Sequence, residues 1–239
     1  MAINQAYGSG GGTLLTNVSG WYLKNNTKTD NAGNTNIVRD EEGYYDPNSA
    51  KMTGARMDIT EVWEAAGDST SLPGNLKVGK VDADTNIDSI SLNCTNSGRP
   101  TLTIVGHVHQ AKASNAPGHL DGSYACSFQF PSGAYGAVNP FGSAVSDVDD
   151  AEVTSSTQTY AMNHQDENAS NGELLAGISR GVTMTGHMEC TTANNVTSGV
   201  KSGGLIVNSS SKPLTNEGLQ KLTVDGVKYI NEKGGGSST

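Results

Sequence analysis

Short runs in which apolar and polar residues alternate recur along the chain, and Gly, Pro, Asn and Asp separate them. Successive side chains of an extended strand point to opposite faces, so this period of two predicts strands with one buried side. The pattern is clearest over 100–110 and over 181–192. The predicted strands cover 20–26, 35–39, 54–63, 76–82, 87–94, 100–110, 122–130, 153–162, 181–192, 204–208 and 221–230.

Turn residues close these runs, as at 96–98 (Asn-Ser-Gly) and 131–133 (Pro-Ser-Gly). Many short strands at such spacings are typical of a sandwich or barrel. Helical patterns are confined to 144–151, 171–176 and 215–221. The sequence therefore predicts an all-β fold, an antiparallel β-sandwich or barrel with extended Gly-rich terminal arms and few short helices.

Composition supports this fold class. Gly, Ser, Thr and Asn supply 100 of the 239 residues, and each of them disfavours a helix interior. Hydrophobic residues make up 34% of the chain and charged residues only 16%, whereas disordered chains combine low hydrophobicity with a high charge content. We therefore expect a folded protein with a small core.

The length of the chain suits one large all-β domain or two small ones, and we favour one body. The predicted organisation is a flexible N-terminal arm (1–19), a single β-rich body (20–230) and a Gly/Ser-rich C-terminal tail (231–239). Ordering such arms costs conformational entropy. We expect them to become ordered on docking to neighbouring molecules.

One internal similarity links residues 103–108 (TIVGHV) and 183–188 (TMTGHM). The Thr, Gly and His are identical, and two further positions are apolar in both. Two equivalent strands of a pseudo-symmetric body would produce this match. Chance would also produce it in a chain so rich in Thr and Gly.

Charge and cysteine content restrict the classes of partner. The net charge of −9 and the pI near 4.9 argue against a surface that holds nucleic acid. Three widely spaced cysteines, Cys94, Cys126 and Cys190, do not form a disulfide framework and indicate reduced thiols in a cytosol. No targeting signal or apolar run of membrane-spanning length occurs. We expect no sequence-specific nucleic-acid partner and no membrane association.

Two motifs for catalysis or phosphate binding are incomplete. Residues 177–181 match the G-x-S-x-G nucleophile elbow around Ser179, which needs an Asp and then a His later in the chain. The last histidine is His187, only eight residues further on, so a plain turn is predicted. Residues 74–80 fit G-x-x-x-x-G-K, but Val81 follows Lys80 where a hydroxyl must reach magnesium, which favours a strand edge.

The acidic segment Asp82–Asp88 has the alternating oxygen ligands of a calcium loop. Ile87 replaces the Gly at loop position six and Asn93 replaces the bidentate Glu at position twelve. We interpret the segment, with Asp82, Asp84 and Asp88, as a solvated acidic turn. An adventitious calcium site is the alternative.

His107 and His109 share one face of a predicted strand, because side chains two apart point the same way. Together with Cys126 or Cys190 on a neighbouring strand they could hold zinc, although no zinc-ligand spacing supports this. We interpret them as histidines on the polar face. The overall expectation is that the chain is not an enzyme, with no catalytic, cofactor-binding or metal-binding residue.

Three stretches, 20–23 (GWYL), 37–43 (IVRDEEG) and 55–60 (ARMDIT), resemble the opening of small tail-tube-like structural proteins of tailed bacteriophages and prophages. In those proteins a strand, a loop, an I-x-D-x-x-G turn and a long hairpin strand follow one another. A second region, with CTN at 94–96 and PTLT at 100–103, followed by Gly106-His107, resembles a strand pair common in phage virion proteins.

This resemblance implies a structural subunit of a phage particle, foremost a tail tube protein. Its partners would be other copies of itself, in stacked hexameric rings around a DNA channel with an acidic bore, and other virion proteins. Its location would be the virion, with assembly in the host cytoplasm. A capsid decoration or minor capsid protein, and a host- or glycan-binding β-domain at a tail tip, are the alternatives.

Overall fold

The computed structural model of the chain describes residues 14–15, 19–31, 34–36, 42, 51–53, 56–67, 71–74, 76–81, 85–109, 122–133, 135–168, 174–213 and 220–230. Strands account for 61% of the structure, and no helix in these ranges reaches seven residues. The all-β prediction is confirmed.

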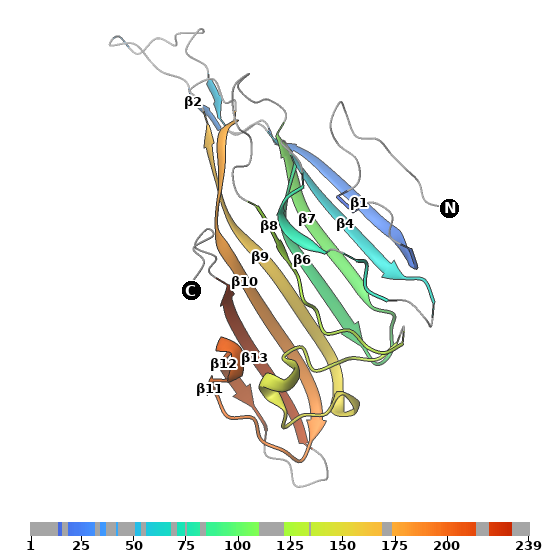
Figure 1. The fold of residues 1–239 in the computed structure, drawn as a ribbon. Helices are drawn as coiled ribbons and strands as arrows, with labels where there is room; N and C mark the ends of the chain where they lie inside the picture. The colour runs from blue at the N-terminus through green and yellow to red at the C-terminus, as the bar shows by residue number, and fades with distance from the viewer. Residues whose placement is uncertain are drawn as a thin grey trace, which may run out of the picture.

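Eleven strands form one large antiparallel sheet in the order β1-β4-β7-β6-β9-β10-β13-β12-β11, with β5 attached to β6 and β8 attached to β5 (Figure 1). The strands of this sheet are β1 (Trp21–Asn31), β4 (Arg56–Ala65), β5 (Lys77–Lys80), β6 (Thr85–Thr95), β7 (Thr101–His109), β8 (Ser123–Ala125), β9 (Val153–Asn168), β10 (Leu174–Thr192), β11 (Gly199–Val200), β12 (Ile206–Ser211) and β13 (Gln220–Ile230). A separate pair joins β2 (Asn34–Asn36) to β3 (Lys51–Thr53). The sheet is open, so the closed barrel named as one alternative does not form.

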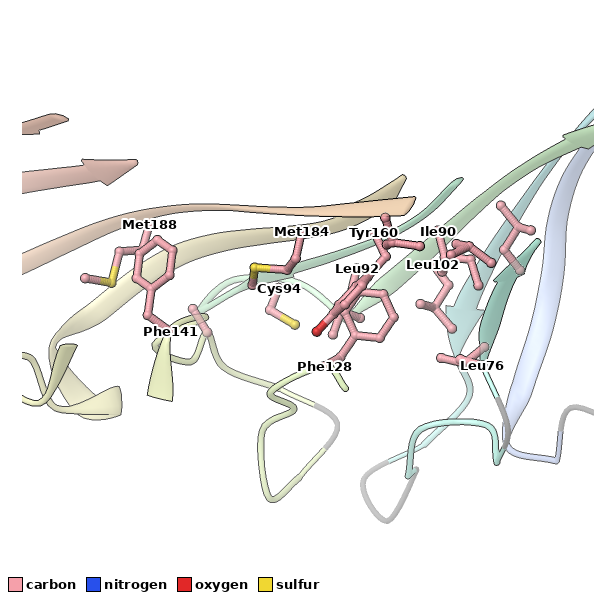
Figure 2. Packing of buried hydrophobic residues seen from close by; sticks show 14 of the residues in the cluster. Leu76, Ile90, Leu92, Cys94, Leu102, Phe128, Phe141, Tyr160, Met184 and Met188 are labelled. Carbon is pink, nitrogen blue, oxygen red and sulfur yellow. The ribbon is translucent and has the colours of Figure 1, made fainter. Parts of the chain in front are cut away.

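The core lies on one face of the sheet, because the apolar phase of each alternating strand points there. Ile90 and Leu92 of β6, Leu102 and Ile104 of β7 and Met188 of β10 are all fully buried. Figure 2 shows Ile90, Leu92, Leu102 and Met188 on this side of the strands. The period of two in the sequence therefore becomes a one-sided core.

Residues 126–133 and 135–149, the cover segment, run across this core face instead of forming a second regular sheet. Gln158 of β9 holds the cover segment at Gln129 by two hydrogen bonds, accepting from its N–H at 2.8 Å and donating to its carbonyl at 2.7 Å. The Tyr160 hydroxyl donates to the Ser127 carbonyl at 2.9 Å. Polar side chains of the sheet thus satisfy the irregular backbone that covers it.

Phe141 anchors the cover segment in a notch between two strands. Gly186 of β10 pairs with Gly226 of β13, and both lie under the Phe141 ring. A Cβ built at Gly186 would lie 2.3 Å from Phe141 Cε1, which is far inside contact distance. The buried Asn139 accepts from the Phe141 N–H at 3.0 Å and donates to the Val145 carbonyl at 2.6 Å. The two glycines therefore provide space that this local framework fills.

The predicted helices are largely wrong. In place of 144–151 there are two 3₁₀ turns, η2 (Gly142–Val145) and η3 (Asp150–Glu152), and a third, η4 (Ser202–Gly204), precedes β12. Residues 174–176 of the predicted helix 171–176 begin β10, and residues 220–221 of the helix predicted at 215–221 begin β13. The remaining residues of these two helices lie outside the described chain. Long-range pairing has overridden local propensity here.

The strand predictions are confirmed in position for most elements, although β1, β9 and β10 each extend well beyond the runs 20–26, 153–162 and 181–192 predicted for them. Only Ser123–Ala125 of the run 122–130 is a strand, because the rest belongs to the cover segment. The short strands β3 and β11 were not expected. Residues 37–39 of the run 35–39 fall outside the described ranges.

The predicted arm includes one residue that the body buries. Leu14 is only 5% exposed, and its side chain packs beside Gly106 of β7. Its backbone N–H donates to Glu61 Oε1 at 3.0 Å. Residues 1–13 and 16–18 of the predicted arm and residues 231–239 of the predicted tail lie outside the described ranges.

Candidate functional site

The two similar hexapeptides occupy β7 and β10, and their histidines have the same kind of partner. His107 Nδ1 lies 2.8 Å from Asp88 Oδ2, and His187 Nδ1 lies 2.7 Å from Asp225 Oδ1. Each histidine follows a glycine that lies on the core face. The sequence similarity thus corresponds to two strands that share one local arrangement. In each strand a glycine faces the core, and the next residue is a histidine paired with an aspartate of a neighbouring strand.

His107 and His109 lie on the polar face of β7, opposite the core-facing Leu102 and Ile104, but unexpectedly they are buried there. Their exposed fractions are 0% and 6%, and their rings meet edge to face with centroids 5.0 Å apart. The reason is that the end of β7 is buried on both faces of the sheet. Asp88 also accepts from Asn86 Nδ2 at 2.8 Å. Asp88 therefore belongs to a strand network and not to an acidic turn.

His187 and Asp225 also lie on the face of the sheet away from the core, but they are exposed there, with side-chain exposures of 43% and 45%. Ser209 of β12 donates a further hydrogen bond to Asp225 Oδ2 at 3.0 Å. In a neutral imidazole whose Nδ1–H donates to an Asp carboxylate, Nε2 carries no proton and can accept a hydrogen bond. Sequence inspection missed this pair, because Asp225 is adjacent only through the pairing of β10 with β13.

That geometry supplies a proton acceptor without a binding cavity. Ser209 contacts Asp225 and not the histidine, so the three groups lack the order of a nucleophilic triad. The pocket lined by Tyr160 and Met184 is on the other face of the sheet. The His187 pair therefore acts as a surface contact between strands.

The remaining motifs fall on strands. Ser179 belongs to β10 and its backbone pairs with His164, so the predicted plain turn is wrong. A register shift follows, where Gly181 has φ +108°. Lys80 ends β5, as the strand-edge interpretation predicted. Asp82 and Asp84 lie outside the described residues.

Metal-ligand geometry is not assembled in the described part of the chain, where no group of three His, Cys, Asp or Glu side chains is placed to hold an ion. The structure brings His107 and His109 together with Asp88, but Cys126 and Cys190 do not complete such a group. The expectations of no catalytic residue and no cofactor stay predictions.

The three cysteines are free thiols, and burial raises the pKa of each. The pKa values reach about 12 for Cys94, about 12 for Cys126 and about 11 for Cys190. At Cys126 a hydrogen bond from the Val78 backbone opposes part of the rise in pKa. Because the thiolate is the nucleophile, the folded thiols are unreactive near neutral pH.

The raised thiol pKa values predict a loss of stability in alkali. Between the unfolded thiol pKa of 9.0 and the folded values, the folded state holds more protons than the unfolded state. The free energy of unfolding therefore falls as pH rises through this window, and the thiol contribution is fully present below it. Alkylation with iodoacetamide at pH 10 follows the thiolates without interference from the eight tyrosines, and it should be slow in folded protein and fast in denaturant, where the thiols are mostly ionised. Equally fast alkylation of the folded protein would contradict the burial.

Strand β1 forms one edge of the described sheet. It bonds to β4 along one side, and no described strand pairs with its other side. A bulge between Leu23 and Asn25 interrupts its register, and Lys24 and Lys28 lie on it. Bulges and lysines are features that limit indiscriminate pairing of edge strands.

An exposed aromatic and charged group lies at the start of this edge strand. Glu64 of β4 binds both the Tyr22 hydroxyl and the Lys24 ammonium. Arg99 donates to the Tyr135 hydroxyl at 3.2 Å and lies over its ring, 5.9 Å from the centroid. Tyr22 is 41% exposed and Tyr135 is 50% exposed. Tyrosine and arginine on a solvated surface are the residues that most often anchor protein interfaces.

None of the helices in the described ranges combines the length and the hydrophobicity that a membrane span requires. Comparison of the sequence with models of known protein families gives no match. Comparison with curated protein sequences likewise gives none at a significant level.

Proposed function

We propose that the protein is a self-assembling structural subunit of a tailed-bacteriophage particle, foremost a tail tube subunit. The observation that carries the proposal is the open 11-stranded sheet with the 11-residue edge strand β1. An edge of this length is a template for another chain. The aromatic and charged group around Tyr22 and Tyr135 adjoins it and adds interface chemistry.

The limited protection of β1 favours a defined partner over open-ended association. Lys24, Lys28 and the bulge suppress random pairing but leave most of the strand regular. A closed ring satisfies every edge with a copy of the same chain. The sequence resemblance of 20–23 and 55–60, which contribute to β1 and β4, to tail-tube-like proteins gives this ring its proposed role.

The charge of the chain agrees with a ring through which DNA passes. The net charge of −9 repels phosphate and limits binding along a channel wall. The proposed rings are hexameric, stack into a tube and join other virion proteins. Assembly takes place in the host cytoplasm.

Self-association is the direct test. Full-length protein at high concentration is expected to sediment as rings or longer tubes, with sixfold views in negative-stain micrographs. Deletion of residues 1–12 keeps Leu14 and its bond to Glu61, so this variant should stay folded, with an unchanged far-UV spectrum, and remain monomeric.

A different assembly would favour a different role in the virion. Threefold particles would favour a capsid decoration protein. Full-length protein that stays monomeric at high concentration, with no rings or tubes on the grid, would rule out the tube.

A further inference from the structure

Lys228 is a charged residue at a position of β13 where the alternation of the strand directs side chains toward the core. In β13 the neighbouring inward positions hold Leu222, Val224 and Gly226, and Lys228 continues this phase. Its register partner is Met184 of β10, which in turn pairs with the buried Tyr160 of β9. The alternation of the strand therefore carries an ammonium group to the core side of the sheet.

A pocket of about 280 Å³ surrounds this side chain. The sheet contributes one wall, and the cover segment and η4 contribute the others. Phe141, Met184 and Leu205 supply apolar surface, whereas Gln129 and Ser202 supply polar groups. Figure 2 shows Phe141, Met184 and Tyr160 along the same side of the sheet. This volume is just below the usual range for drug-sized ligands and suits a smaller molecule.

Among the described residues that line the pocket, Lys228 is the only charged one. It forms no ion pair with a carboxylate in the described chain, in contrast to Lys221 on the same strand, which lies 3.2 Å from Glu189. Gly203, with φ +67°, lies beside it, and a Cβ there would come 3.9 Å from Lys228 Nζ. A half-buried ammonium group that has no carboxylate partner in the described part of the chain, and that lies beside apolar side chains, is complementary to an anion on an apolar stem.

We propose that this pocket binds a small carboxylate with a short apolar stem. The carboxylate pairs with Lys228, and the stem contacts Phe141 and Met184. The source of the carboxylate is either a free small molecule or an Asp or Glu side chain of another copy. The proposal does not depend on the tail tube role.

A competing explanation makes a different prediction. The pairing of β12 with β13 ends at Ile206 opposite Val227, so Lys228 lies where β13 has become a local edge. An inward-pointing charge at an edge discourages strand pairing. In that case removing the charge would increase self-association and leave ligand binding absent.

Sodium hexanoate is the probe, titrated into isotopically labelled full-length protein at a concentration where it is unassembled. We expect saturable NMR shifts at the amides of Gln129 and Ala144. Lys228→Met should weaken binding at least about tenfold, because a charged hydrogen bond is lost. Lys221→Met removes a lysine from the outer face of the same strand and should bind hexanoate as the wild type does. Hexan-1-ol should bind more weakly than hexanoate.

Ala144→Phe, which fills the pocket while retaining Lys228, should also abolish binding and provides a second variant if Lys228→Met does not fold. Absence of saturable shifts in the wild type, or equal binding by Lys228→Met, would overturn the proposal. Assembled protein distinguishes the two sources: hexanoate is excluded if a neighbouring copy supplies the carboxylate, and it binds if the natural ligand is a free small molecule.

Discussion

Gly186→Ala is expected to destabilise the protein by about 3 kcal/mol, because overpacking a tight contact displaces a buried aromatic ring. The new Cβ would lie 2.3 Å from Phe141 Cε1 and 2.9 Å from Cζ. The backbone of β10 is held between β9 and β13, so the ring must move instead. Urea unfolding midpoints of the two proteins measure the effect.

A double-mutant cycle tests the cause. Phe141→Ala alone removes the ring, so adding Gly186→Ala to it should cost far less than Gly186→Ala costs in the wild type. Gly122→Ala is the matched control, because a Cβ there meets nothing within 4 Å. Additive effects of the two substitutions would show that Phe141 does not occupy the glycine notch.

Glu61→Leu is expected to lower the free energy of unfolding by about 3 kcal/mol, because it leaves buried donors without an acceptor. The Glu61 side chain is fully buried on the core face of β4. It accepts from the Leu14 N–H at 3.0 Å and from the Trp63 indole N–H at 3.0 Å. Glu61→Gln keeps one acceptor oxygen and should cost only about 1 kcal/mol.

The Leu14 contact gives the same substitution a second readout. Without Glu61 the Leu14 N–H loses its hydrogen bond to the body, so limited proteolysis between residues 13 and 20 should accelerate in Glu61→Leu. Glu64→Gln is the control, since Glu64 lies on the outer face of the same strand and binds exposed partners. Equal protection of Glu61→Leu and wild type would contradict the clamp.

Charged residues at inward positions were the signal that sequence reasoning missed. Glu61 occupies the buried phase of β4 between Ile59 and Trp63, and Lys228 occupies that of β13. Both break the alternation that predicted the strands. A charged side chain directed toward the core requires a partner or a cavity. Glu61 has hydrogen-bond partners there, and Lys228 lines a pocket.

His107 and Ser179 are residues that the sequence analysis did single out but whose surroundings it did not predict. The pair of histidines was placed correctly on one face of a strand, but their burial depends on β4 and β6 lying beside β7. Ser179 lies inside a long hairpin because β9 pairs with β10 beyond the reach of β6. Residue spacing along the chain does not reveal which strands lie beside β7 or how far β9 and β10 pair.

The sequence by itself determined the all-β class and the position of most strands, because a period of two and frequent turn residues act locally. Tertiary structure decided that the sheet stays open, that an irregular segment covers its core, and that Gly186 and Gly226 meet under Phe141. These features depend on contacts between residues 29 or more positions apart. Register between distant strands is set by the packing of the whole sheet, and local patterns carry no record of it.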